Sequence, residues 1–145
     1  MPSIPLHYVD LRTFCYATED DKRVEDALRT FLPEEFEIQR AETEGHHGDR
    51  ILVMSARVEK ADEIRSVLST LEALPDDEFE AVRDELDERV TENTEFFLTL
   101  SKQAAFEGEV RQGEGITFRA KVEAYPAKKE SAIENVEDVL ETLEE

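Results

Sequence analysis

The amino-acid sequence predicts an α+β fold in which helices pack on one face of an antiparallel or mixed β-sheet. Strand-like and helix-like patterns follow one another in the order strand, helix, strand, strand, helix, helix, strand, strand, helix. Residues 115–125 alternate apolar and polar side chains without a break, as a strand with one buried face does. Each helical segment carries one apolar stripe, which suits helices that lie on a sheet.

The first half of the chain predicts a strand, a helix and a hairpin. Residues 4–16 mix β-branched, aromatic and polar side chains, which is typical of a strand. A helix is expected to begin at Thr18, whose hydroxyl can cap it, and its apolar residues recur at helical spacing as far as Phe31. Residues 36–43 and 51–58 have the pattern of two strands, joined by a loop that two glycines bracket.

The second half predicts two more helices, two strands and a last helix. The helices cover residues 60–74 and, after the break at Pro75, a segment whose stripe reaches Val90. The strands cover residues 95–102 and 115–125. An acidic helix follows Pro126. We therefore expect one domain over residues 1–126 and a C-terminal acidic helix over residues 127–145, packed on the domain or appended to it.

The charge composition points to the cell in which the protein works. Asp and Glu total 37 against 17 Lys and Arg, a formal net charge of −20. The many carboxylates repel one another, and concentrated salt screens this repulsion, because the Debye length falls to roughly 3 Å at 1 M salt. The excess of acidic residues therefore predicts a halophilic, salt-accumulating host. In dilute buffer this charge would oppose nucleic-acid binding. Under strong screening, the position of each basic residue matters more for nucleic-acid binding than the net charge of the protein.

The sequence lacks the patterns typical of membrane proteins, secreted proteins and common classes of enzyme. No apolar run approaches the length of a membrane span, and no leader pattern precedes the first strand, so we expect a cytoplasmic protein that does not bind membranes. Cys15 is the single cysteine and lies in an apolar strand pattern, which predicts a buried, inert thiol. No catalytic triad order, phosphate-binding glycine loop or zinc spacing is present. We expect no enzyme activity, no metal and no cofactor.

The first candidate binding residues follow the apolar run that ends at Leu100. Lys102 and Gln103 come just where a strand should end, and two alanines and Gly108 leave the backbone there unshielded. A lysine can meet a phosphate as a point charge, and a glutamine can donate and accept hydrogen bonds. The alternative is a plain connection between strands with a short helical turn.

A second group of candidates lies on the exposed face of the predicted sheet. Arg119 and Lys121 point away from the apolar side of residues 115–125. Arg12 is a candidate to share their face, although the alternation in the first strand leaves its register ambiguous. With Phe97 and Tyr125 they form a pattern of cations and aromatic rings that suits RNA phosphates and bases. The alternative is an ordinary solvated sheet face with scattered long side chains.

His46 and His47 lie in the glycine-bracketed loop, close to Asp49. Adjacent histidines rarely both reach one metal ion, and the further ligands are missing from the pattern, so metal binding is disfavoured. One histidine can instead close a local hydrogen bond, for example to Asp49. The functional alternative is an exposed histidine that contacts a phosphate or a base.

Three blocks of the sequence resemble a known family. They cover residues 12–20 (RTFCYATED), 45–49 (GHHGD) and 101–108 (SKQAAFEG). Their order and spacing are similar to those of small archaeal RNA-binding proteins described as predicted exosome subunits, formerly a domain of unknown function. The resemblance covers residues 4–125 and implies a fold similar to that of the ribosomal protein that holds 5S RNA. It also implies a link to RNA processing, with structured RNA and exosome or RNase P components as partners.

The resemblance assigns the RNA surface to Arg12, the loop of His46 and His47, Lys102 and Gln103. The sequence departs from the family at Asp49, which replaces an asparagine and cannot donate a side-chain hydrogen bond when ionised, and at Ser101, which replaces an aspartate. We therefore expect a non-catalytic RNA-binding accessory protein. The alternative is a protein-interaction module that docks through the last helix, whose apolar stripe also suits core packing or a homodimer contact.

Overall fold

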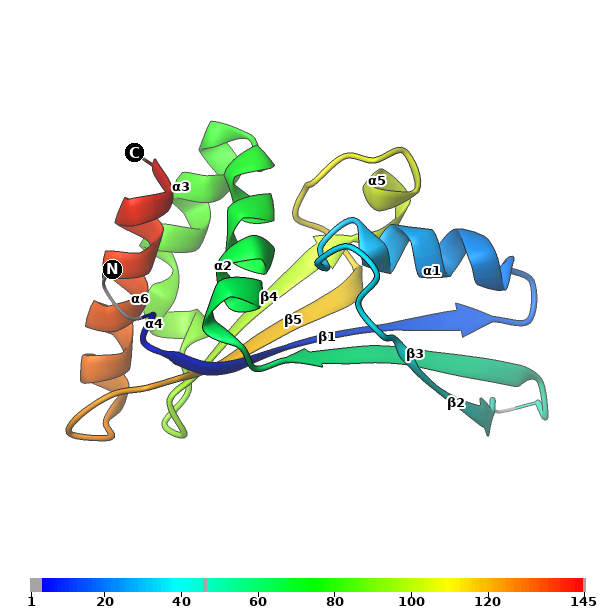
Figure 1. The fold of residues 1–145 in the computed structure, drawn as a ribbon, viewed down its shortest axis with the longest axis horizontal. Coiled ribbons are helices and arrows are strands. Elements are labelled where there is room, and N and C mark those ends of the chain that lie inside the picture. The colour runs from blue at the N-terminus through cyan, green and yellow to red at the C-terminus, as the bar shows by residue number, and fades with distance from the viewer. Residues whose placement is uncertain (1–3, 46, 145) are drawn as a thin grey trace.

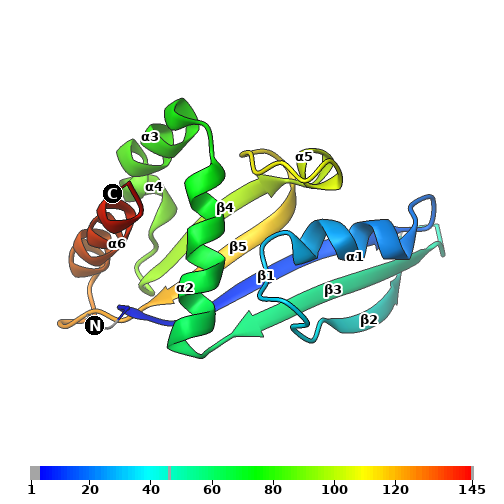
Figure 2. The ribbon, with the colours of Figure 1, turned by 45° about the horizontal axis from the view of Figure 1, so that its top comes forward.

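The computed structural model of the protein describes residues 4–45 and 47–144. Within these residues the strands form a single antiparallel sheet in the order β2-β3-β1-β5-β4. All the helices lie on the same face of the sheet, and the other face is left uncovered (Figures 1 and 2). The strands are β1 (Leu6–Tyr16), β2 (Gln39–Glu44), β3 (Arg50–Val58), β4 (Glu95–Ser101) and β5 (Gly115–Val122).

The helices form one layer above the sheet, which confirms the predicted α+β fold with helices on one face. Those named in Figure 1 are α1 (Asp21–Arg29), α2 (Ala61–Thr70), α3 (Asp76–Asp84), α4 (Leu86–Arg89), α5 (Lys102–Phe106) and α6 (Lys129–Glu144). A 3₁₀ turn, η1 (Leu71–Ala73), extends α2. The short α5 contains Lys102 and Gln103, for which the sequence allowed either a binding loop or a connection with a short helical turn.

One predicted helix start was wrong by two residues. Asp20, not Thr18, is the N-cap of α1, and its carboxylate accepts a hydrogen bond from the Lys22 backbone N–H. Its backbone is extended, as an N-cap requires. Both residue types can cap a helix, so the local sequence pattern does not distinguish them.

The core lies between the helices and the sheet. The helix-facing side of the sheet supplies fully buried residues such as Leu11 and Phe118, and the helices supply Leu28 and Ile64. α6 contributes to the same core, because Val136 is buried within it. The apolar stripe of the last helix therefore packs against the chain's own domain rather than lying free.

The register of β1 decides which side chains reach the uncovered face of the sheet. A shift in the pairing of β1 with β5 between Leu6 and Tyr8 interrupts the alternation at the start of the strand, which is why the sequence left the register ambiguous. Beyond this irregularity the alternation is regular. Val9, Leu11, Thr13 and Cys15 are buried under the helices, and Tyr8, Asp10, Arg12, Phe14 and Tyr16 lie on the uncovered face, which we call the open face.

Candidate nucleic-acid interface

Two arginines converge on one carboxylate at the centre of the open face. Asp10 of β1 accepts hydrogen bonds from Arg57 of β3 at 2.8 and 2.9 Å and from Arg119 of β5 at 3.0 Å. The three residues are direct cross-strand neighbours, since Asp10 pairs with both arginines in the sheet register. Arg119 also lies 3.5 Å from the carboxylate of Glu95 on β4. The sheet therefore holds two guanidinium groups in a fixed orientation.

The protonation states of this group follow from the same contacts. Partial burial would raise the pKa of Asp10, but the hydrogen bonds from Arg57 and Arg119 outweigh it and hold that pKa below its ordinary value. The hydrogen bond to Asp10 raises the pKa of each arginine further. All three groups are therefore charged at neutral pH.

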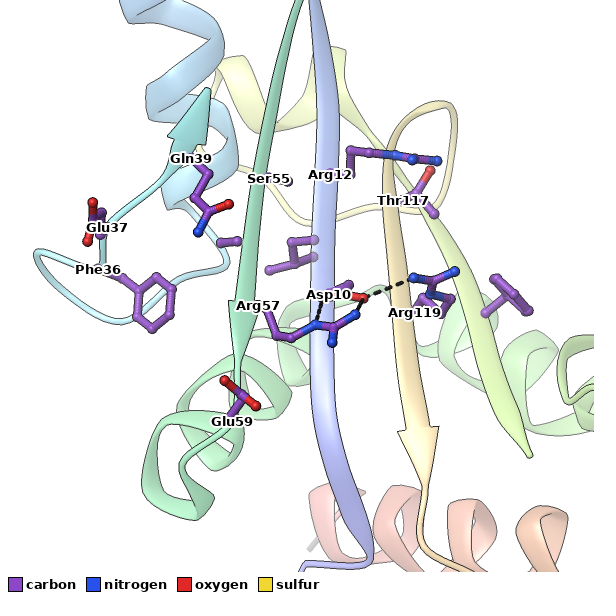
Figure 3. Close-up of a pocket in the computed structure, with 13 residues that line it drawn as sticks. Asp10, Arg12, Phe36, Glu37, Gln39, Ser55, Arg57, Glu59, Thr117 and Arg119 are labelled. Atoms are coloured by element: carbon purple, nitrogen blue, oxygen red, sulfur yellow. Dashed lines mark hydrogen bonds and ion pairs between the residues drawn. The ribbon is translucent and has the colours of Figure 1, made fainter. Parts of the chain in front are cut away.

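A shallow pocket of about 610 Å³ lies over these residues. In Figure 3 its side chains stand in front of the strands, and the helices lie behind the sheet. Strands β1, β3 and β5 supply its floor, and the segment that leads into β2 supplies Phe36 and Glu37 at one side. The lining is mixed, with arginines, hydroxyl groups and an amide beside carboxylates. Such a lining can donate hydrogen bonds to phosphates and exchange them with bases.

Arg12 differs from the other arginines of the open face in having no acidic partner in the described part of the chain. Its neighbours across the strands are Ser55 and Thr117, and its guanidinium lies 5.7 Å from the centre of the Phe14 ring. Within the described residues, no carboxylate lies in ion-pair distance of Arg12, which is exposed. Its charge is therefore available to an anionic ligand.

Two aromatic side chains lie at the end of β1 beyond Arg12. Phe14 is 36 % exposed and Tyr16 is 49 % exposed, and their ring centres are 6.4 Å apart with a tilt of 31° between the planes. Val53 and Ile51 pair with them on β3 and share their face. This end of the open face is therefore apolar and aromatic, whereas its centre is charged.

Lys121 and Phe97 complete the open face on the side of β4. Lys121 lies on β5 two residues beyond Arg119, and its ammonium group donates to the carbonyl oxygen of Asn93. Phe97 of β4 is the cross-strand neighbour of Arg119 and lines the pocket. The structure thus brings Arg12, Arg119 and Lys121 onto one face, as the sequence pattern suggested.

Lys102 lies elsewhere and is already engaged. It is 9 % exposed, and its ammonium group donates to the Phe14 carbonyl oxygen at 2.9 Å and to Glu19 at 2.8 Å. The same group lies 5.2 Å from the centre of the Tyr16 ring. Gln103 is exposed on α5, in the helix layer, so it does not share the open face with Arg12.

The histidine loop connects β2 to β3 at the end of the sheet that carries Tyr16. His46 lies outside the described residues, and His47 is exposed. The loop is closed by a hydrogen bond from the Gly45 N–H to the Asp49 carbonyl oxygen. Arg50, at the start of β3, lies 3.0 Å from Asp21 at the start of α1. Arg50 and Asp21 directly follow the blocks 45–49 and 12–20, and Lys102 of the third block contacts the block 12–20, so the three sequence blocks lie at one end of the sheet.

Four residues of the open face were not among the site residues predicted from the sequence. They are Asp10, Arg57, Phe14 and Tyr16. The signal for the three on β1 was present in the alternation of residues 8–16, where polar or aromatic side chains at even positions face away from the buried odd positions. Arg57 carried no separate signal, because only the pairing of β3 with β1 places it beside Asp10.

The architecture is that of an α+β protein with an antiparallel sheet, and two solved structures share it. A DUF54 protein of Archaeoglobus fulgidus superposes with a TM-score of 0.83 at 28 % identity, covering 92 % of this chain and 99 % of that one. A DUF54 protein of Methanothermobacter thermautotrophicus superposes with a TM-score of 0.76 at 37 % identity, covering 93 % of this chain and 98 % of that one.

Sequence comparison then identifies the family. A family model described as RNA binding matches residues 8–122. A protein of Pyrococcus abyssi, named an RNA-binding protein, is 38 % identical over 144 residues, which cover 93 % of this chain and 94 % of that protein. The chain belongs to this family of RNA-binding proteins. The resemblance drawn from the three sequence blocks is confirmed to this extent. In the described residues no helix is long and apolar enough to cross a membrane.

Proposed function

We propose that the protein is a non-catalytic RNA-binding protein and that its RNA lies on the open face of the sheet. The observation that carries the proposal is the gathering of Arg12, Arg57, Arg119 and Lys121 on this face, in a chain whose net charge is −20. Most of the remaining surface repels a polyanion. Exposed aromatic rings next to these cations add a surface on which bases can stack.

The arginines of the open face have distinct parts in this proposal. Arg57 and Arg119 each use some of their N–H donors on Asp10, which fixes the planes of both guanidinium groups and leaves the other donors for phosphate oxygens. Arg57 is further fixed by a cation–π contact, since its Cζ atom lies 3.9 Å from the centre of the Tyr8 ring. Arg12 has no carboxylate partner among the described residues, so its donors can turn to the ligand. Preorganised donors lose less conformational entropy on binding than mobile ones.

Lys102 takes a supporting part rather than a direct one. Because its charge is neutralised by Glu19 and its ammonium group is hydrogen-bonded, it is poorly placed to meet a phosphate. We assign it to positioning the end of β1. His47 lies in the loop just beyond Tyr16, so RNA that extends along β1 would reach that loop. Gln103 would contact only RNA that wraps around the end of the sheet.

We further propose that the process served is RNA processing or exosome-associated or ribosome maturation, with structured RNA as the ligand. This step rests on the family resemblance of the three sequence blocks. The alternative, docking on a processing complex through the last helix, has less support because Val136 and Leu140 of its stripe are buried in the core. The acidic surface supports a salt-rich cytoplasm as the working environment.

Fluorescence anisotropy with labelled structured and single-stranded RNAs in about 2 M KCl tests the proposal under strong screening. We expect saturable binding by the wild type. Replacing Arg12 and Arg119 by Gln should weaken it about tenfold or more, since hydrogen bonds to charged groups are worth about 1.5–3 kcal/mol each. Lys22→Gln combined with Arg23→Gln on α1 is the matched control, since this pair makes the same charge change in the helix layer. Equal affinity of the double variant and the control would contradict the site, and absence of binding by the folded protein would contradict the function.

A further inference from the structure

We infer that the RNA bound by the open face contains unpaired nucleotides and that Phe14 and Tyr16 form a platform on which two bases stack. The inference rests on the proposed function and names the class of RNA that it requires. Two exposed aromatic rings lie at the end of β1, beside Arg12, which has no carboxylate partner among the described residues.

The geometry of the two rings suits bases that have left a duplex. Phe14 and Tyr16 are two residues apart on one strand, so their side chains stand on the same face of the sheet about 6.6–6.8 Å apart. Their ring centres are 6.4 Å apart and their planes differ by 31°, so neither ring covers the other. Each ring therefore keeps π surface for a base, and Val53 and Ile51 widen the apolar floor beside them.

The surroundings fix the backbone that carries both rings before any ligand arrives. Lys102 donates to the Phe14 carbonyl oxygen at 2.9 Å and lies 5.2 Å from the centre of the Tyr16 ring. The Tyr16 backbone N–H donates to Glu19 at 3.1 Å. These contacts replace the strand partner that β1 lacks here, because the pairing with β5 ends at Thr13. A fixed platform binds with less loss of conformational entropy than a mobile one.

A duplex would not use this platform. In double-stranded RNA the faces of the bases are covered by their neighbours, and a protein meets mainly phosphates and 2′-hydroxyl groups. Arginines alone would suffice for such contacts. Unpaired bases, in contrast, stack on aromatic side chains, and this stacking stabilises the complex. Arg12, 5.7 Å from the Phe14 ring and without a carboxylate partner among the described residues, is placed to meet the phosphate that accompanies such a base.

An apolar protein partner fits the same patch less well. Such a partner would have to bury the charge of Arg12 next to the rings or supply a carboxylate for it. The arrangement of one free cation and two rings within the described open face instead matches a ligand that carries an anion and a π surface in each repeating unit. An unpaired stretch of RNA has this chemistry.

The test compares three RNAs and three proteins at about 2 M KCl, chosen for strong screening. The RNAs are a single strand, the blunt duplex of the same sequence and a hairpin that displays this sequence in its loop. The proteins are the wild type, the double variant Phe14→Leu and Tyr16→Leu, and the control Phe106→Leu. The substitutions keep apolar bulk and remove the π surface. Phe106 is the last residue of α5, in the helix layer, where it packs beside Arg23 of α1 and away from the open face.

We expect the wild type and the control to bind the single strand and the loop at least tenfold more tightly than the duplex. The double variant should lose most of this preference and bind the duplex unchanged. A 2-aminopurine in the single strand should change fluorescence on binding to the wild type and not to the double variant, which reports stacking separately from affinity. Equal binding of duplex and single strand, unaffected by the variant, would overturn the inference while leaving RNA binding intact. Failure of all three RNAs to bind would instead overturn the proposed function.

Discussion

Lys102 and Glu19 form an ion pair with 2.8 Å between the ammonium nitrogen and the carboxylate oxygen, although they are 83 residues apart in the sequence. The pair connects the start of α5 to the segment between β1 and α1. The same ammonium group donates to the carbonyl oxygen of Phe14, where β1 runs on past the end of its partner β5. A basic residue that the sequence offered as an RNA contact thus completes the hydrogen bonding of a strand end.

Replacing Lys102 by Met should lower the free energy of unfolding by about 2 kcal/mol, because it leaves the Phe14 carbonyl and the Glu19 carboxylate without their donor. Methionine keeps most of the side-chain length. Chemical denaturation monitored by circular dichroism measures the change. Lys22→Met is the control, since the Lys22 side chain is exposed in its ion pairs with Glu25 and Asp26, and their loss should cost less than about 0.5 kcal/mol. Equal stability of the two variants would contradict the structural role of Lys102.

The sequence predicted the layers of this fold because periodicity reports which side of an element is buried. The alternation in residues 115–125 placed Arg119 and Lys121 correctly on the face opposite to the core. In β1 the irregular pairing between Leu6 and Tyr8 interrupts the alternation, so the sequence could only suggest that Arg12 lies on that face. Which side chains of a strand face the core depends on neighbouring residues, so it can be predicted from the local sequence.

What the sequence did not predict depends on contacts between distant segments. The convergence of Arg57 and Arg119 on Asp10 requires the strand order β3-β1-β5, which no single segment encodes. The partner of Lys102 requires α5 to meet the segment after β1. A lysine after an apolar strand has the same local pattern whether it binds a phosphate or caps a strand end. Only the tertiary structure shows that this one already has a carboxylate partner.

Replacing Asp10 by Asn should tighten RNA binding severalfold at low salt. The change removes a negative charge from the open face and releases donors of Arg57 and Arg119 for phosphates. The slope of log K against log salt concentration should become steeper by about 0.7–0.9, as one added phosphate contact predicts. Anisotropy titrations over a range of KCl concentrations measure both quantities. Asp26→Asn on α1 makes the same charge change away from the open face and serves as the control. Weaker binding by Asp10→Asn would show instead that its carboxylate is needed to orient the arginines.

Glu19 should contribute stability that is lost in acid. Burial would raise its pKa, but the hydrogen bonds from Lys102 and from the Tyr16 N–H hold the pKa below the ordinary value of 4.5. The unfolded chain therefore takes up this proton first as the pH falls. The contribution is fully present above the ordinary pKa and disappears as the pH falls through the lower pKa of the folded state.

The difference in unfolding free energy between the wild type and Glu19→Gln isolates this contribution, because the general effect of protonating the many other carboxylates cancels. We expect a difference of about 1–3 kcal/mol at neutral pH, as for a charged hydrogen-bond partner. The difference should shrink towards zero below the ordinary pKa of the carboxyl group. A difference that stays constant down to the acid limit would contradict the ionic role of Glu19.

Cys15 should be almost inert in the folded protein. The thiol is 2 % exposed, and its sulfur lies 3.2 Å from a carboxylate oxygen of Asp21. Burial and the neighbouring Asp21 raise the pKa of Cys15 to about 11. At about pH 8 the thiolate fraction is then roughly two hundred times smaller than for a free cysteine of pKa about 8.5. Alkylation by iodoacetamide, followed by mass spectrometry, should therefore be at least a hundredfold slower in the native protein than in denaturant. Comparable rates would place the thiol in contact with solvent.

The last helix should be needed for folding, because its apolar stripe belongs to the core. Leu140 is 2 % exposed, so Leu140→Ala should lower the free energy of unfolding by about 3 kcal/mol through the cavity it leaves. Glu137→Ala, at an exposed position of α6, should have little effect. Deleting residues 126–145 should abolish the cooperative unfolding transition. A truncated chain that still unfolds cooperatively at unchanged denaturant concentration would show that α6 is an appended element. The apolar stripe of that helix would then be free to bind another protein.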